Sequence, residues 1–268
     1  MTPIALTIAG SDSSGGAGIQ ADLKTFAALG VYGASVITAL TAQNTRGVTA
    51  IHDVPADFIA AQIDAVFTDL DVRAVKIGML SQVAAIEAVA DGLDRHAAHN
   101  VVLDPVMVAT SGDRLLAANA VAALRARLVP RALVITPNLP EAAALLDRPL
   151  ACDEAAMEAQ ARALLALGPQ AVLIKGGHGE TRESADFLVD AAGVTRLSAP
   201  RIATRNTHGT GCTLSSAIAA GLARGLDLAS AAREAKAFVT DAIAGADVLH
   251  VGHGAGPLHH FHAFWRDR

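Results

Sequence analysis

The chain alternates short apolar runs with segments of helical periodicity along most of its length. The apolar runs predict buried strands at 4–9, 35–40, 74–77, 101–103, 133–135 and 171–174. Helical patterns are predicted at 17–29, behind Pro55, at 83–93, at 211–222 and at 228–243. Repeated strand–helix units imply a parallel sheet with helices on both faces. We therefore expect an α/β fold, a three-layer αβα sandwich with a mostly parallel central sheet.

Two further segments carry expectations about packing. The runs 187–189 and 194–197 flank the turn-like residues 191–193, which predicts a hairpin. Behind Pro55, a first-turn proline, apolar residues recur at helical spacing. They predict one buried stripe, made of Phe58, Ile59, Ile63, Val66 and Phe67.

Composition supports a layered interior. Of the 268 residues, 52% are hydrophobic but only 3% are aromatic, so Ala, Val and Leu build the core. Such residues suit helices layered on a buried parallel sheet. Because no linker or low-complexity segment interrupts the pattern, we expect a single domain over residues 1–268. The net charge of −5 argues against a general nucleic-acid binder, which needs a basic face.

The chain also carries expectations about its location. The opening Met1-Thr2-Pro3 lacks the basic region of a secretory signal, and no apolar run free of charge or Gly reaches membrane-spanning length. The two cysteines, Cys152 and Cys212, lie far apart, which favours a reducing compartment over a disulfide scaffold. We expect a soluble, cytoplasmic protein that binds no membrane.

Residues 206–213 read Asn-Thr-His-Gly-Thr-Gly-Cys-Thr and open a helical pattern. A Gly-rich loop at a helix start presents free backbone N–H groups and the positive end of the helix dipole, which favour phosphate. A thiol placed there is expected to have a lowered pKa, so Cys212 is a candidate base or nucleophile. The alternative is a tight turn followed by an inert core cysteine.

Polar residues stand at or just beyond the ends of the apolar runs. They are Asp12, Gln43, Lys76, Asp104, Asn138 and Lys175. Ligands of open α/β sheets bind outside the carboxyl ends of the strands, so this pattern favours a site over the alternative that these residues merely begin loops. Near the C-terminus, His259, His260 and His262 form a cluster that we interpret as a solvated tail or partner surface rather than a metal site.

Several motifs along the chain resemble the hydroxymethylpyrimidine/phosphomethylpyrimidine kinases of the ribokinase-like superfamily. In order, they lie at 8–22, 39–45, 76–80, 104–107, 136–141, 175–178 and 209–212. The resemblance covers nearly the whole chain. One departure is Thr110, where many relatives have Lys.

The resemblance implies a set of site residues. The loop Gly209, Thr210 and Gly211 matches the family's anion hole, with Cys212 at the catalytic-base position. Gln43 matches the residue that hydrogen-bonds the aminopyrimidine. The remaining matches are substrate-pocket residues (Gly10, Asp22, Met79, Val106), acids near Mg²⁺, directly or through water (Asp104, Glu141), and nucleotide-side residues (Lys175, Asn138, Thr204, Lys236).

Each of these residues also has a structural interpretation. Gln43 and Asp104 would cap turns, Glu141 would favour its helix N-terminus, and Asp22 and Lys175 would be solvated surface charges. The resemblance implies ATP and Mg²⁺ as cofactors and phosphorylation of hydroxymethylpyrimidine to its monophosphate and then its diphosphate, for thiamine diphosphate. Pyridoxal kinase and an inert pyrimidine-binding regulator are the alternatives, and a homodimer is left open.

Overall fold

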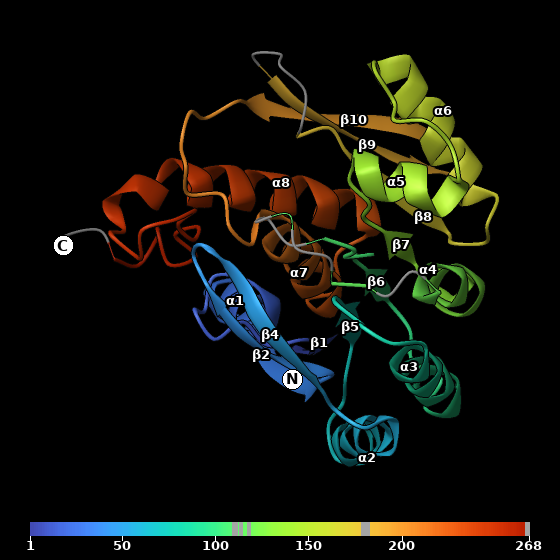
Figure 1. Ribbon diagram of the computed structural model, residues 1–268. Helices are drawn as coiled ribbons and strands as arrows, with labels where there is room; N and C mark the ends of the chain where they lie inside the picture. Colours follow the sequence, from blue (N-terminus) through green and yellow to red (C-terminus); the bar gives the residue numbers. More distant parts are fainter. Residues whose placement is uncertain (109–111, 113–114, 117–118, 178–182, 266–268) are drawn as a thin grey trace.

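The computed structural model describes residues 1–108, 112, 115–116, 119–177 and 183–265 (Figure 1). Its centre is an eight-stranded sheet in the order β10-β9-β8-β7-β6-β5-β1-β2. Neighbouring strands from β2 to β8 pair in parallel, and β8, β9 and β10 pair antiparallel. The strands are β1 (Ile4–Ala9), β2 (Tyr32–Ile37), β5 (Ala74–Ile77), β6 (Val101–Leu103), β7 (Val134–Ile135), β8 (Ala171–Lys175), β9 (Glu183–Asp190) and β10 (Gly193–Pro200). The mostly parallel sheet and the predicted hairpin are both confirmed.

Helices cover both faces of this sheet, which confirms the three layers. One core joins the sheet to α2 (Ala56–Phe67), α3 (Val83–Arg95), α4 (Ala120–Ala123), α5 (Leu139–Leu146) and α6 (Glu154–Leu165). The other joins it to α1 (Gly18–Ala28), α7 (Thr210–Ala223) and α8 (Leu228–Ala244). Successive strand residues serve opposite cores, as Val102 and Leu103 do, because side chains alternate across a strand. The central strands are therefore apolar on both faces.

Helix α7 lies directly under the sheet and packs closely against α8. Small residues make this possible, because a Cβ on Gly221 would lie 2.8 Å from Cβ of Ala231. Helix α7 also packs against the central strands β1, β5 and β6. No helix in the described part of the chain is long and apolar enough to cross a bilayer.

The predicted strand at 35–40 is confirmed only over 35–37, which lie in β2, because the chain leaves the main sheet at Thr38. Its backbone N–H donates to Ala9 and its hydroxyl donates to the carbonyl of Met79. Beyond this turn, β3 (Ala39–Asn44) and β4 (Gly47–Asp53) form a separate two-stranded antiparallel sheet. This hairpin carries Gln43 over the site.

Two packing expectations are also corrected. Phe58 is 61% exposed, because the buried side of α2 is formed by Ile59 and Ile63. His259 and His260 are buried instead of forming a solvated tail. The His260 ring lies 3.0 Å from the Thr213 hydroxyl of α7, and burial lowers the pKa of His260 to about 4. The histidine segment therefore packs as part of the fold.

Candidate active site

One large cavity, of about 960 Å³, opens where the parallel strands end and α7 begins. Its walls come from strands β1, β5, β8, β9 and β10, the β3–β4 hairpin, helices α5, α7 and α8, and the segment that follows β6. All of the polar residues expected at strand exits line it: Asp12, Gln43, Lys76, Asp104, Asn138 and Lys175. The cavity therefore lies where open α/β sheets bind their ligands.

The loop before α7 forms part of this wall. Gly209 has a φ of 84°, and a Cβ there would lie 1.9 Å from the carbonyl oxygen of Gly16, so only glycine fits. A Cβ on Gly211 would lie 3.2 Å from Nζ of Lys175 and 3.5 Å from Oδ2 of Asp104. The N–H groups in the first turn of a helix lack acceptors within the helix. Position 211 in this turn lies beside the pair Lys175 and Asp104.

The expected lowering of the pKa of Cys212 is wrong for the protein without ligands. Burial raises the pKa of this thiol to about 11, and the charges of Asp22 and Asp104 add to the rise. The ammonium of Lys76 and the backbone N–H of Gly18 act in the opposite direction but are outweighed. The thiol is therefore protonated at neutral pH.

A carboxylate–lysine cluster faces the start of α7. Nζ of Lys175 donates to Oδ1 of Asp104 at 2.9 Å and lies 3.9 Å from Oε2 of Glu141. Burial favours the neutral form of Asp104, but Lys175 and Lys76 outweigh it and lower the pKa of this acid. Burial raises the pKa of Glu141 to about 7, against the pull of Lys175. Near neutral pH Asp104 is therefore ionised, whereas Glu141 is partly protonated.

Asn138 and Glu141 also hold the start of α5. The side chain of Asn138 accepts from the backbone N–H of Glu141, and Glu141 accepts from the N–H of Asn138, which is a capping box. The helix-start interpretation of Glu141 is thus correct, and it coexists with a place in the cavity wall.

Asp22 does not line the cavity. Its carboxylate is fully buried and accepts hydrogen bonds from Lys76, Thr7 and Ser216. Asp22 is therefore not a solvated surface charge, and it lies outside the cavity lining. It anchors Lys76, whose ammonium reaches the cavity wall.

The end of the cavity near the hairpin is apolar. Met79 and Leu115 pack with Ala39, and Val106 lies against this group. Gly10 keeps the wall thin, because a Cβ there would lie 3.0 Å from the sulfur of Met79. The expected pocket residues Gly10, Met79 and Val106 thus lie together around a slot beside Gln43.

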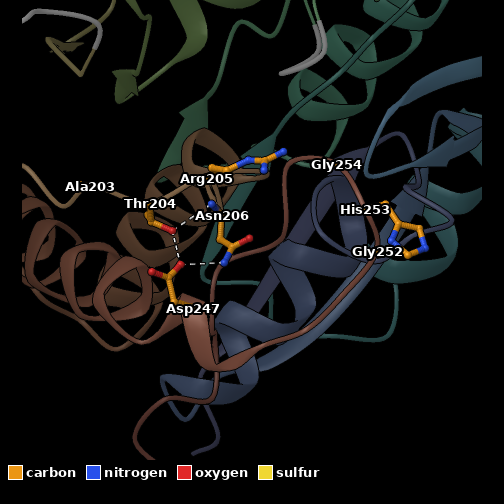
Figure 2. Close-up of a pocket in the computed structure, with 8 residues that line it drawn as sticks. All are labelled: Ala203, Thr204, Arg205, Asn206, Asp247, Gly252, His253 and Gly254. Atoms are coloured by element: carbon orange, nitrogen blue, oxygen red, sulfur yellow. Dashed lines mark hydrogen bonds between the residues drawn. The ribbon is translucent and has the colours of Figure 1, made fainter.

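The opposite end contains Lys236, whose Nζ donates to Oδ2 of Asp186 at 2.7 Å. Thr204 lies elsewhere, in a surface recess of about 680 Å³ (Figure 2). Its hydroxyl bonds the carboxylate of Asp247, which also accepts from Asn206. Thr204 therefore supports the chain before the Gly loop instead of lining the large cavity.

Sequence reasoning did not assign roles to Lys76, or to the pair Asp12 and His208. A lysine inside an otherwise buried strand was a usable signal for Lys76. His208 lies 2.8 Å from Oδ2 of Asp12, although 196 positions separate the two residues, so no local pattern links them. Hydrogen bonds, led by that of His208, outweigh burial and lower the pKa of Asp12 to about 2.

The donor set at Asp104 and Glu141 fits Mg²⁺. The described residues contain no group of three or more His, Cys, Asp or Glu side chains able to hold a metal. Mg²⁺ is commonly held by one or two carboxylates together with substrate phosphates and water, so these two acids suffice. Two residues of the family-like motifs, Thr110 and His178, lie outside the described residues.

Known proteins resemble this chain along its length. The family model described as phosphomethylpyrimidine kinase matches residues 12–259. A hydroxymethylpyrimidine/phosphomethylpyrimidine kinase of Rhizobium meliloti is 62% identical over 267 residues, covering 100% of both chains. The crystal structure of Clostridium difficile phosphomethylpyrimidine kinase superposes with a TM-score of 0.80 at 44% identity, covering 90% of this chain and 99% of that one. An ADP complex of Bacillus subtilis pyridoxal kinase superposes with a TM-score of 0.89 at 38% identity, covering 97% and 98%.

Proposed function

The chain belongs to the phosphomethylpyrimidine kinase family, and from that premise we propose its substrate and the roles of its residues. It phosphorylates 4-amino-5-hydroxymethyl-2-methylpyrimidine with ATP and then phosphorylates the monophosphate to the diphosphate. The product is the pyrimidine half of thiamine diphosphate. The observation that carries this proposal is one cavity that joins a carboxamide, Gln43, to the helix start at Cys212.

The two ends of the cavity suit the two substrates. A carboxamide presents a donor and an acceptor side by side, which complements the edge of an aminopyrimidine. The apolar slot of Met79 and Val106 suits the flat ring and its methyl group. Lys175, beside the start of α7, and Lys236, at the end opposite the hairpin, supply positive charge for the phosphates of ATP.

Phosphoryl transfer relies on positioning and charge stabilisation. The N–H groups of Gly211 and Cys212 would hold the transferring phosphoryl group, and Lys175 would neutralise its charge. Asp104 and Glu141 would hold Mg²⁺, which supplies charge neutralisation for the phosphates when bound.

Cys212 would act as the general base in the first step. The O–H bond of the hydroxymethyl group breaks, its proton goes to sulfur, and its oxygen bonds phosphorus as the bond to the leaving ADP breaks. Because burial keeps the free thiol protonated, the thiolate must be stabilised within the substrate complex. Lys76 and the N-terminus of α7 are the groups on this side of the cavity that favour it.

Pyridoxal kinase is the nearest alternative, and an inert regulator is another. The family match does not favour either, and a pure binder has no need of Cys212 beside a phosphate-binding loop. The test supplies purified protein, ATP and Mg²⁺ with hydroxymethylpyrimidine or pyridoxal and resolves the products by mass. We expect the pyrimidine monophosphate followed by the diphosphate. Phosphorylation of pyridoxal alone, or of neither compound, would overturn the proposal.

Two wider features are also proposals. We propose that residues 1–268 act as one domain and that the protein is cytoplasmic. Cooperative unfolding and cell fractionation test them in turn, and light scattering on purified protein measures whether it forms the homodimer that the resemblance leaves open.

A further inference from the structure

A carboxamide alone cannot distinguish an aminopyrimidine from its 4-oxo analogue. The amino compound offers a donor at its exocyclic nitrogen and an acceptor at the ring nitrogen, and the oxo compound offers the reverse order. Gln43 can serve either order by a 180° rotation about its Cγ–Cδ bond, which exchanges its donor and acceptor. Selectivity therefore requires something that holds the carboxamide in one orientation.

The backbone of Gln43 is already held in place. The hydroxyl of Ser13 accepts from the N–H of Gln43 at 2.9 Å and donates to its carbonyl oxygen at 2.7 Å. Only the side-chain carboxamide remains to be oriented. Its two polar atoms lie between His208 and Thr41: Nε2 is 3.4 Å from Nε2 of His208, and Oε1 is 3.2 Å from the hydroxyl of Thr41.

The protonation of Nε2 of His208 determines which end of the Gln43 carboxamide can face it. Asp12 is buried and ionised, and its carboxylate accepts from Ser14, Gly16 and Ala17 as well as lying 2.8 Å from Nε2 of His208. Nε2 of His208 must therefore carry a proton, whether the ring is neutral or cationic. If the amide nitrogen of Gln43 faces this N–H group, two hydrogen-bond donors face each other. If the amide oxygen faces it, the N–H group has a second acceptor in addition to Asp12.

The proton of Thr41 leads to the same orientation. Its hydroxyl lies 2.8 Å from the carbonyl oxygen of Ser11, which can only accept, so the single hydroxyl proton is committed there. Toward Gln43 this hydroxyl is then an acceptor and calls for the amide nitrogen. Rotating the carboxamide by 180° places its oxygen beside His208 and its nitrogen beside Thr41, which satisfies both neighbours. The nitrogen and oxygen of a carboxamide are assigned from their hydrogen-bond partners, so these two neighbours fix the orientation.

We propose that His208, held by Asp12, and Thr41, held by Ser11, lock the carboxamide of Gln43 with its oxygen toward His208 and its nitrogen toward Thr41. This lock makes the site selective for a 4-aminopyrimidine over the 4-oxo analogue. His208 and Thr41 are thus positioning residues for specificity. The inference rests on the proposed function, since it concerns recognition of the same substrate.

The experiment compares kcat/KM for 4-amino-5-hydroxymethyl-2-methylpyrimidine and for its 4-oxo analogue. We expect the wild-type protein to prefer the amino compound by about 100-fold or more, because the oxo compound leaves buried polar groups unpaired. His208→Leu and Thr41→Val each remove one side of the lock and should lower this ratio by about tenfold or more. His208→Gln, which restores a donor, and Thr41→Ser, which restores the hydroxyl, should recover most of it.

Thr49→Val is the matched control, because Thr49 is exposed on the same hairpin and bonds only locally to the carbonyl of Ala42. It should leave the ratio unchanged. The Thr41→Val result decides the proposal even where His208→Leu fails to fold. An unchanged ratio in folded Thr41→Val overturns the lock while leaving the proposed function intact. Failure of the wild-type protein to phosphorylate the amino compound overturns both.

Discussion

Lys76 donates to both carboxylate oxygens of Asp22, at 2.9 and 2.8 Å, and both side chains are fully buried. Burial alone would favour a neutral lysine, but the charges of Asp22 and Asp104 outweigh it and raise the pKa of Lys76. The pair therefore holds a cation whose charge favours the thiolate form of Cys212. Loss of either partner should lower the stability of the fold.

Asp22→Asn should destabilise the fold by about 3–5 kcal/mol, because it leaves the buried ammonium of Lys76 without its counter-ion. Lys76→Met should cost a similar amount through the unpaired carboxylate. The double variant should cost less than the sum of the two single changes. Denaturant unfolding measures all three, and simple additivity would show that the two residues do not act as a pair.

Gln43→Leu should weaken binding of hydroxymethylpyrimidine by about 1–3 kcal/mol per unsatisfied polar group of the ring, with ATP affinity retained. Titration calorimetry with each ligand measures both affinities. Gln170→Leu, at an exposed position far along the chain, is the matched control. If pyrimidine affinity is the same in both variants, Gln43 does not contact the ring.

Gly211→Val should abolish phosphoryl transfer while the protein still folds. The added Cβ would stand 3.2 Å from Nζ of Lys175, in the space where the phosphoryl group approaches the backbone. Circular dichroism checks the fold, and an ATP-coupled product assay checks transfer. A folded variant with full activity would remove the first turn of α7 from the anion site.

Glu141 should make stability depend on pH between about 4.5 and 7. Its pKa is raised from 4.5 to about 7 in the fold, mainly by burial, so the folded protein binds the proton more tightly than the unfolded chain. This contribution to stability is fully present below pH 4.5 and is lost as the pH rises through about 7.

Denaturant unfolding at several pH values measures this dependence, with Glu141→Gln as the variant that lacks the titrating group. Its stability should decline less than that of the wild type over this window. Glu158→Gln, on the exposed side of α6, serves as the control. Identical profiles for wild type and Glu141→Gln would contradict the raised pKa.

The core of the fold could be predicted because it depends on local pattern. Strands β1, β5, β6 and β8 are mostly apolar and mostly buried, and each is visible in the sequence without knowledge of its neighbours. The break at Thr38 could not be predicted, because its bonds to Ala9 and Met79 come from distant segments. Thr38 is a β-branched residue of the kind that strands favour, so nothing local marks the turn.

The same division holds for the site. The residues at strand exits were identifiable, since topology alone brings them to one edge. The buried pairing of Asp22 was not identifiable, because its partner Lys76 lies 54 positions away. For Cys212, the helix start was visible in the sequence but the burial that raises the pKa of the thiol was not. Long-range packing therefore decided the charge states that local pattern left open.

In the proposed mechanism, Cys212 removes a proton from the substrate in the first phosphorylation. The nucleophile of that step is an alcohol, whereas the nucleophile of the second step is a phosphate monoester, already largely dianionic because its second pKa is near 6. A general base should therefore matter much more for the first step, where its loss typically costs about 10²–10⁴-fold.

Single-turnover rates of Cys212→Ala with hydroxymethylpyrimidine and with its monophosphate test whether Cys212 acts as the general base. Cys152→Ala, which removes the exposed cysteine, is the matched control and should behave as wild type in both steps. Cys212→Ala should slow the first step by about 10²-fold or more and the second step far less. Equal losses in the two steps would contradict it and would assign Cys212 to the phosphoryl group or to packing.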